Sequence, residues 1–417
     1  FRRAIERIFR VKAGWSFLFT NIVGADKCTV HRCDLSRGIV VDDTHRTITF
    51  RLTRAGFVPL TSIATAPVPP GTPFHDVGFT PIPGTGPYMI ASANKHEIRY
   101  VRNPRFHEWS HAAQPDGNPD EIVMRFGLSP AQEVREIEQG KADWSADGVP
   151  GNLLPEVRRR FPGQWHSLLS PDTDGLQLNT SIPPFNDIRV RKALNLAIDR
   201  AAIVRMYGGR LTATPACQLL PPGLPGYRPY CPYTRRPGAD GRWRAPDLAR
   251  ARALVAASGT RGEQVTASCF AGEGPVGNTP VVGYTARVLR ELGYRPQAHL
   301  VPRGSKVDWK AVQIGCFSGE DFQPADFFGN LGCSSPADNG WFCDRRFDAD
   351  ILRARMLEGT DPRAANALLT KLDREATDRA IVLPLVNPHF YDFVSARVKN
   401  YVRDPMFGLV PDQASLR

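Results

Sequence analysis

Apolar and polar residues follow two different periods along this chain, and each period predicts one kind of secondary structure. Residues 47–52 alternate polar and apolar side chains, which is the pattern of a half-buried strand. In residues 188–207 apolar side chains recur every three or four positions, which predicts a helix with one buried face. Asp187 can cap the start of this helix, and Gly208-Gly209 ends it. The chain therefore combines strands with amphipathic helices.

The C-terminal half shows strands and helices in alternation. Residues 264–270 read as a strand, 279–292 as a helix and 297–301 as a second strand. This order forms a βαβ unit with two parallel strands, so we expect an α/β fold. Further strands are predicted at 96–101, 121–126, 175–180, 311–316 and 381–386, and further helices at 1–9, from Ser129, from Pro246, near 348–357 and at 362–379.

Composition is that of a soluble globular protein, with 417 residues, 42% hydrophobic and 23% charged. This length suffices for two or three compact units, and no run approaches the roughly 20 apolar residues that span a bilayer. The net charge of +11 comes from arginines that are scattered along the chain. Basic runs such as 158–160 and 235–236 are short, so we do not expect nucleic-acid binding.

The chain opens directly in the predicted helix at 1–9. No initiator Met, signal peptide or lipid-acceptor cysteine stands before it. We therefore expect that an upstream portion, with any targeting information, precedes Phe1.

Eight cysteines suggest an oxidising compartment. Three pairs bracket short loops rich in Pro, Gly, Asp or Asn: Cys28 with Cys33, Cys217 with Cys231, and Cys333 with Cys343. Cys269 and Cys316 lie in apolar strands, and they either pair across neighbouring strands or stay buried as thiols. Zinc bound by Cys28, His31 and Cys33 is the alternative, but no CxxC motif or second ligand cluster accompanies them. We therefore expect disulfides and no metal.

Motifs of enzymes are weak or missing. Gly272-Glu-Gly-Pro-Val-Gly277 matches the dinucleotide-binding fingerprint, but Pro275 stiffens the loop, the helix starts only after the third glycine, and the second strand ends without an acid for a ribose. The motifs of serine hydrolases, zinc proteases and P-loop proteins are absent from the sequence. We therefore expect neither catalysis nor a cofactor.

An acidic segment with aromatic residues follows the predicted strand at 311–316. Glu320, Asp321 and Asp326 lie there among phenylalanines. A carboxylate at the carboxyl end of a strand faces the crevice of an α/β sheet, where it can pair with a ligand ammonium group while Phe317 or Phe322 covers apolar parts. The alternative is a solvated acidic loop that caps the next helix, and the residues alone favour neither.

Several pieces of the chain match a known family in the expected order. The most specific piece is 178–200, which reads LNTSIPPFNDIRVRKALNLAIDR. The others are 47–52, Gly84-Thr-Gly-Pro-Tyr88, Arg102-Asn-Pro104, 137–143, Pro221-Pro-Gly223 and Pro384-Leu-Val386. From about residue 39 onward, the chain resembles the oligopeptide-, dipeptide- and nickel-binding proteins of ATP-driven importers.

The resemblance implies a type II periplasmic-binding fold, in which two α/β lobes joined by a hinge close over a ligand. The implied limits are 1–81 for the remnant of an N-terminal subdomain, 82–180 for lobe I, 181–394 for lobe II, and 395–417 for the return to lobe I. Strands near 180 and 394 would cross between the lobes. The family's first strands are not found in this sequence, and its cysteines outnumber those of most members.

The resemblance also implies a ligand site. In the peptide binders, an acid in the loop that matches 319–324 holds the ligand's amino terminus. Counting back from Pro324 selects Glu320, whereas the usual acid–aromatic pair selects Asp321 with Phe322, so we expect both acids to contribute and place Asp321 first. Asn179 and Thr180 are similar to residues of a strand that lines the cleft in relatives.

We therefore expect an extracytoplasmic, monomeric receptor that binds peptide-like ligands and delivers them to an ABC permease in the membrane. Two alternatives remain for the ligand and the setting. One is the ligand-sensing domain of an actinobacterial transcriptional regulator, and the other is a binder of nickel or another small solute. A hydrolase, which peptide turnover would reveal, is the remaining alternative.

Overall fold

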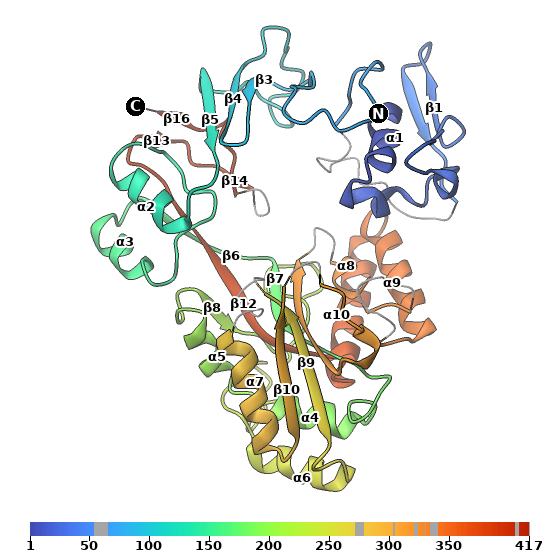
Figure 1. The fold of residues 1–417 in the computed structure, drawn as a ribbon, viewed down its shortest axis with the longest axis vertical. Coiled ribbons are helices and arrows are strands. Elements are labelled where there is room, and N and C mark those ends of the chain that lie inside the picture. The colour runs from blue at the N-terminus through green and yellow to red at the C-terminus, as the bar shows by residue number, and fades with distance from the viewer. Residues whose placement is uncertain are drawn as a thin grey trace. The chain divides into compact units, whose positions relative to one another are not determined.

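The computed structural model describes residues 1–53, 66–271, 279–302, 305–320, 324–329, 331–333, 341–404 and 408–416. The chain divides into two compact units (Figure 1). Unit 1 comprises Phe1–Asp147 and Phe393–Arg417, and unit 2 comprises Gly148–Asp392. Among the described helices, none has the length and apolar character needed to cross a membrane.

Unit 1 begins with a small core of its own. Helix α1 (Arg2–Arg10) packs its apolar face near the antiparallel strands β1 (Ile39–Asp42) and β2 (Thr47–Phe50). Strand β2 confirms the strand predicted from the alternation at 47–52. The fully buried side chains of this core are Ile5, Phe19, Ile22, Leu35 and Ile39.

The rest of unit 1 contains an antiparallel sheet of β3 (Tyr88–Ala93), β4 (Glu97–Arg102) and β5 (Glu121–Arg125). None of the residues in these three strands is fully buried. Helix α2 (Pro130–Glu138) begins with the predicted capping box of Ser129 and Gln132. Two short antiparallel pairs complete the unit: β13 (Val398–Lys399) with β16 (Ser415–Leu416), and β14 (Arg403–Asp404) with β15 (Gly408–Leu409).

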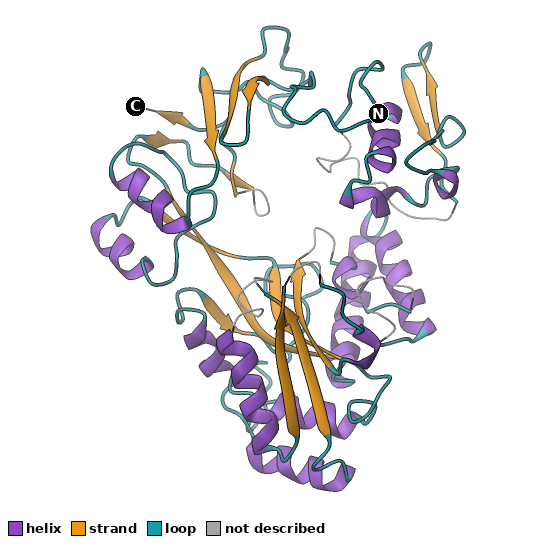
Figure 2. Ribbon diagram, in the orientation of Figure 1, coloured by secondary structure: helices purple, strands orange, loops and turns teal. Residues whose placement is uncertain are grey.

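Unit 2 is built on a seven-stranded mixed sheet in the order β10-β9-β11-β7-β12-β6, with β8 beside β12. Figure 2 shows the strands in orange and the helices in purple. Strands β9 and β10 are parallel and α7 (Thr279–Glu291) connects them, which confirms the predicted βαβ unit. The strands are β6 (Trp165–Leu169), β7 (Asp172–Leu178), β8 (Ala213–Pro215), β9 (Gln264–Phe270), β10 (Arg295–Val301), β11 (Ile314–Glu320) and β12 (Val382–Phe393).

Helices cover both faces of the central strands. Leu176 and Ile314 belong to an apolar core shared with α4 (Ile188–Ala197), α5 (Arg200–Met206), α6 (Leu248–Ser258) and α7 (Thr279–Glu291). Phe317 and Val382 belong to a second core shared with α8 (Asp326–Gly329), α9 (Arg345–Glu358) and α10 (Pro362–Asp378). Helix α3 (Leu154–Arg160) precedes β6. The sheet is therefore the middle of three layers, as in many α/β folds.

The single helix predicted at 188–207 is wrong, because the structure forms two helices there. Ile198 has an extended backbone, with ψ of 123°, and ends α4. The Asp199 carboxylate then accepts hydrogen bonds from the backbone N–H groups of Ala201 and Ala202, which starts α5. The apolar stripe continues through the break, so hydrophobic periodicity alone did not reveal it.

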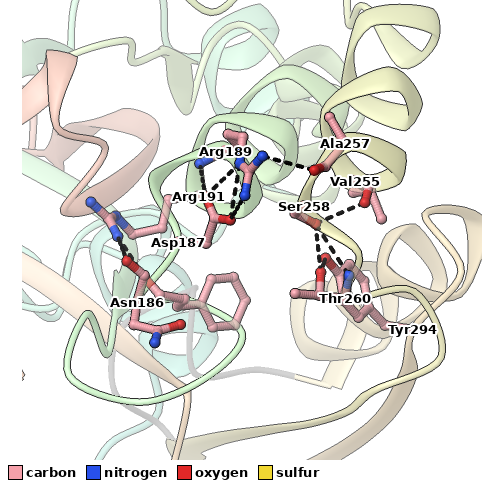
Figure 3. Close-up of polar contacts among 10 residues, drawn as sticks. Asn186, Asp187, Arg189, Arg191, Val255, Ala257, Ser258, Thr260 and Tyr294 are labelled. Atoms are coloured by element: carbon pink, nitrogen blue, oxygen red, sulfur yellow. Dashed lines mark hydrogen bonds and ion pairs between the residues drawn. The ribbon is translucent and has the colours of Figure 1, made fainter.

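The start of α4 is tied to neighbouring elements by charged side chains (Figure 3). Arg189 pairs with the capping residue Asp187 and donates to the carbonyl of Ala257 in α6, with an N–O distance of 2.7 Å. Arg191 donates to the carbonyl of Phe185 and to that of Arg379, which follows α10. Two arginines of the most specific sequence piece thus join three helices.

Arg200 at the start of α5 is a fully buried cation. Its guanidinium donates to the carbonyls of Ala216, Pro384 and Asn195 and to the Asn195 side chain. Burial lowers its pKa to about 10, so the group remains charged at neutral pH. Hydrogen bonds to oxygen atoms thus replace the hydration of this charge.

All eight cysteines form disulfides: Cys28–Cys33, Cys217–Cys231, Cys269–Cys316 and Cys333–Cys343. The three pairs indicated by short spacing form, and Cys269 and Cys316 pair across β9 and β11 instead of staying as thiols. The lobe limits at 82–180 and 181–394 stay a prediction, although residues 148–180 lie within compact unit 2.

Candidate functional site at the end of strand β11

Strand β11 has strand partners on both sides only at its beginning. It pairs with β7 along its whole length, from Ile314 opposite Leu178 to Glu320 opposite Asp172. On its other side it pairs with β9 at Ile314 and Gly315. Among the described residues, no strand adjoins that side of β11 at 317–320. This side of residues 317–320, called the open edge below, is the kind of edge to which a further strand can add, although Gly319 itself is buried.

The disulfide Cys269–Cys316 lies directly beyond the paired part of β9 and β11. It follows the last paired residue, Gly315, and joins Cα atoms 5.0 Å apart. Beyond it, β9 remains paired with β10, with Phe270 opposite Val301. The disulfide therefore holds β9 beside β11 at Cys316, just before the open edge.

Along β7 and β11, one face of the sheet changes from apolar to polar. Leu176 and Leu178 lie in the core beneath α4–α7, whereas Asp172 and Asp174 occupy the next positions of the same alternation. These two carboxylates are only 6% and 2% exposed. The register places Ser318 opposite Asp174 and Glu320 opposite Asp172. The end of β11 therefore adjoins two buried acids, which the sequence analysis missed although Asp172-Thr-Asp174 precedes a predicted strand.

The two acids accept hydrogen bonds from hydroxyl groups. Ser318 Oγ donates to Asp174 Oδ1 at 2.7 Å, and Tyr207 Oη donates to Asp174 Oδ2 at 3.1 Å. Ser170 donates to the Asp172 carboxylate. Burial raises the pKa of Tyr207, and the neighbouring Asp174 raises it further. The Tyr207 hydroxyl therefore keeps its proton and remains a donor across the physiological pH range.

The opposite face of β11 carries aromatic rings over glycines. A Cβ atom at Gly319 would lie 2.5 Å from the Phe317 ring, and one at Gly315 would lie 3.0 Å from the ring of Trp341. Trp341 donates to the carbonyl of Trp309 at 2.9 Å, and the Trp309 ring packs edge-on against Phe270. A side chain at 319 would therefore displace the Phe317 ring, and one at 315 would press against the ring of Trp341.

The structure brings two of the predicted site residues to the end of β11. Glu320 is its last residue, and Phe317 is 7% exposed within the core beneath α8–α10. Asp321 and Phe322 lie outside the described residues, as does the motif at 272–277. The ligand contacts of these residues stay a prediction.

Asn179 and Thr180 lie beyond the other end of β7, after Leu178. Asn179 Nδ2 donates to the carbonyl of Val312 at 2.9 Å, and its Oδ1 accepts from Ser181. Thr180 Oγ1 donates to the carbonyl of Trp341 at 2.6 Å. Both side chains thus brace the segments that surround β11, and their ligand contact stays a prediction.

Asp326 belongs to a helix and not to a solvated loop. It starts α8 and forms an ion pair with Arg355 of α9, and burial raises its pKa. In the part of the chain that the structure describes, no three His, Cys, Asp or Glu side chains are arranged to hold a metal ion. The alternative zinc site is wrong, because Cys28 and Cys33 form a disulfide.

Several known proteins are similar to this chain. The model of a family described as bacterial extracellular solute-binding proteins, family 5 middle, matches residues 3–312. Di/tripeptide-binding protein 2 of Pseudomonas aeruginosa (strain UCBPP-PA14) is 26% identical over 78% of this chain and 59% of its own length. The periplasmic oligopeptide-binding protein OppA of Escherichia coli (strain K12) is 23% identical over 67% of this chain and 51% of its own length. The chain thus spans less than two thirds of these relatives.

Solved structures confirm the predicted fold class. The clavulanic acid biosynthesis oligopeptide binding protein 2 superposes with a TM-score of 0.83 at 20% identity, covering 100% of this chain and 79% of that one. The murein tripeptide binding protein MppA of Escherichia coli superposes with a TM-score of 0.70 at 17% identity, covering 99% and 82%. The chain therefore has the mixed α/β fold of periplasmic peptide-binding proteins.

Proposed function

Because the chain belongs to the bacterial extracellular solute-binding proteins of family 5, we propose that it captures peptides outside the cytoplasm and delivers them to an ABC importer. Relatives whose names state a ligand include binders of di-, tri- and oligopeptides and of glutathione, and one named as a probable deoxycholate-binding protein. The protein would act as a receptor and not as an enzyme. Its ligand would be released to a membrane permease.

The open edge of β11 is the observation that carries this proposal. An extended peptide can add to such an edge through main-chain hydrogen bonds, which do not depend on the peptide's sequence. Residues 317–320 carry N–H and C=O groups on the side of β11 away from β7, beyond the part that pairs with β9. A peptide bound there would become a further strand beside β11.

Carboxylates at the end of this edge would hold the peptide's amino terminus. Glu320 ends β11, and Asp321 follows it in the chain. An ammonium–carboxylate pair gains strength where water is excluded, so closure over the ligand would strengthen it. In this proposal Phe322 covers apolar parts of the ligand, and Phe317 supports the strand from below.

The disulfides support an extracytoplasmic location. The four disulfides would persist in an oxidising compartment. In the alternative, the ligand-sensing domain of a cytoplasmic regulator, the cysteines would stay reduced. Titration of thiols in the native, secreted protein should find none. Eight reactive thiols would instead favour the regulator.

The test is a binding measurement with di- to pentapeptides that carry a free or an acetylated amino terminus, with nickel and simple sugars alongside. A ligand at a hundredfold excess over its Kd contributes about 2.7 kcal/mol to the free energy of unfolding, which a thermal shift detects. We expect stabilisation by free peptides and its loss on acetylation. A response to nickel or sugars alone would contradict the peptide class.

Charge-neutral variants test the anchor. The double variant Glu320→Gln with Asp321→Asn should lose binding of free peptides, because neither amide can pair with an ammonium group. The matched control is Glu291→Gln with Asp120→Asn, which makes the same change at two exposed positions. Normal binding by the first double variant would show that the anchor lies elsewhere.

A further inference from the structure

We propose that Tyr207, Asp174 and Ser318 form a hydrogen-bonded link that positions the open end of β11 for its ligand. This inference rests on the proposed function, because it assumes that the edge at 317–320 receives the peptide. The three residues would not touch the ligand themselves. They would act by holding the strand that does.

The link joins three elements through one buried carboxylate. Asp174 in β7 is 2% exposed and accepts from Ser318 in β11 at 2.7 Å and from Tyr207 at 3.1 Å, one bond on each carboxylate oxygen. Tyr207 is the residue that caps the end of α5. Hydrogen bonds to an ionised acceptor are stronger than those between neutral groups. Strand β11 is thereby tied through β7 to a helix.

The position of the link explains why it matters. Up to Gly315, β11 is held by strands on both sides, and at Cys316 the disulfide to Cys269 replaces the β9 pairing. At 317–320 β7 is the one neighbouring strand in the described part of the chain. Ser318 lies in the middle of this segment. A side-chain bond there adds a restraint to the backbone pairing with β7.

The helix end of the link is itself rigid. Helix α5 starts at Asp199, whose carboxylate caps two backbone N–H groups, and continues with the fully buried Arg200. Its C-terminal residue Tyr207 is followed by Gly208, and the Tyr207 carbonyl accepts from Thr212 at 2.6 Å. The hydroxyl of Tyr207 is therefore presented to Asp174 from a fixed backbone.

The experiment compares three single variants that each remove one hydroxyl group from unit 2. Tyr207→Phe and Ser318→Ala each break one bond of the link. Tyr230→Phe is the matched control, because Tyr230 Oη donates to the Asp378 carboxylate at 2.5 Å, far along the chain from β11. With a peptide that stabilises the wild type, we expect Tyr207→Phe and Ser318→Ala to raise the Kd about tenfold. Tyr230→Phe should leave the Kd unchanged.

A second measurement needs no ligand. Hydrogen exchange of the backbone amides at 317–320 should be faster in Tyr207→Phe and Ser318→Ala than in the wild type, and unchanged in Tyr230→Phe. If no peptide binds the wild type, the proposed function fails, while the exchange rates still decide whether the link holds β11. Exchange and affinity like those of the control would overturn the inference. An equal loss of affinity in all three variants would overturn it too, since it would indicate general loosening.

Discussion

The sheets of the two units use the same backbone pairing but bury their side chains to very different degrees. Every residue of β7 in unit 2 is buried, whereas no residue of β3, β4 or β5 in unit 1 is. The cause is the covering: helices pack on both faces of the central strands of unit 2. Apolar contacts dominate strand stability, so unit 2 should tolerate substitutions far less than the β3–β5 sheet.

The proposed ligand edge lies where one face of the sheet of unit 2 changes from apolar to polar. Ile314 is completely buried, while Ser318 four residues later is half-buried in a polar surrounding. The apolar part of β11 thus supplies the support, and its polar end supplies the hydrogen-bonding groups. This division is common in binding proteins, because a well-packed scaffold holds the site in place.

The largest difference between the units should come from their disulfides. Removing Cys269–Cys316 by a double substitution to alanine opens a loop with a sequence separation of 47, whereas Cys28–Cys33 closes one of 5. Loop-closure entropy predicts losses of about 4 and about 2 kcal/mol in the free energy of unfolding. Hydrogen exchange of the backbone amides of each unit, followed at increasing denaturant concentration, measures the two losses of free energy of unfolding. Equal losses would contradict the dependence on loop length.

Matched isoleucines test the packing contrast directly. Ile314→Ala in β11 should lower the free energy of unfolding by about 3 kcal/mol, because it leaves a cavity in a buried core. Ile98→Ala in β4, which is also the central strand of its sheet, should cost about 1 kcal/mol, because Ile98 is only half-buried. Hydrogen-exchange rates of the backbone amides in each sheet give the two losses of free energy of unfolding. A larger cost at Ile98 would show that the β3–β5 sheet is packed more tightly than its exposure indicates.

A third expected difference is a fall in the stability of unit 2 with rising pH, caused by one buried carboxylate. Asp373 in α10 is buried and accepts hydrogen bonds from the backbone N–H groups of Leu219 and Leu220 and from the Gln218 side chain. Burial outweighs these bonds and raises its pKa to about 7. In the described part of unit 1 no carboxylate is buried to this extent.

The sign of this effect follows from proton binding. The usual value of 3.8 applies to unfolded Asp373, so between about pH 4 and 7 the folded state binds more protons than the unfolded state. The free energy of unfolding should therefore fall as the pH rises through this range, by at most about 1.4 kcal/mol per pH unit. Urea unfolding of the wild type and of Asp373→Asn at several pH values measures it. Identical slopes in both proteins would exclude Asp373 as the cause.

Much of the fold could be predicted from local patterns. The strand at 264–270, the capping box at Ser129, and the helix at 362–379 that is found as α10 all depend on contacts within a few residues. Strand β12 was predicted to end near Val386 but continues to Phe393. Pro388 lies within it. Proline has no backbone N–H to donate, so it normally ends a strand and is tolerated only where that position needs no hydrogen-bond partner.

The candidate site could be predicted only in part. The acids at 320 and 321 were predicted through the family resemblance and their role stays a prediction, whereas Asp172, Asp174 and Tyr207 were not singled out. Their role depends on a register between β7 and β11, segments more than a hundred residues apart, and local periodicity contains no information about that pairing. The two buried acids could have been noticed only as charges that interrupt an otherwise apolar strand.

The strand order of unit 2 has a consequence for how the chain folds. Strand β7 ends at residue 178, yet its two neighbours are β11, which ends at 320, and β12, which ends at 393. During synthesis the centre of the sheet therefore cannot close until nearly the whole chain has emerged, and such distant pairings make folding slow. The disulfides between close cysteines can form early, whereas Cys269–Cys316 has to wait for the sheet. Unit 2 therefore cannot complete its sheet while the chain is being made, and a protein exported as proposed above would cross the membrane before this sheet forms.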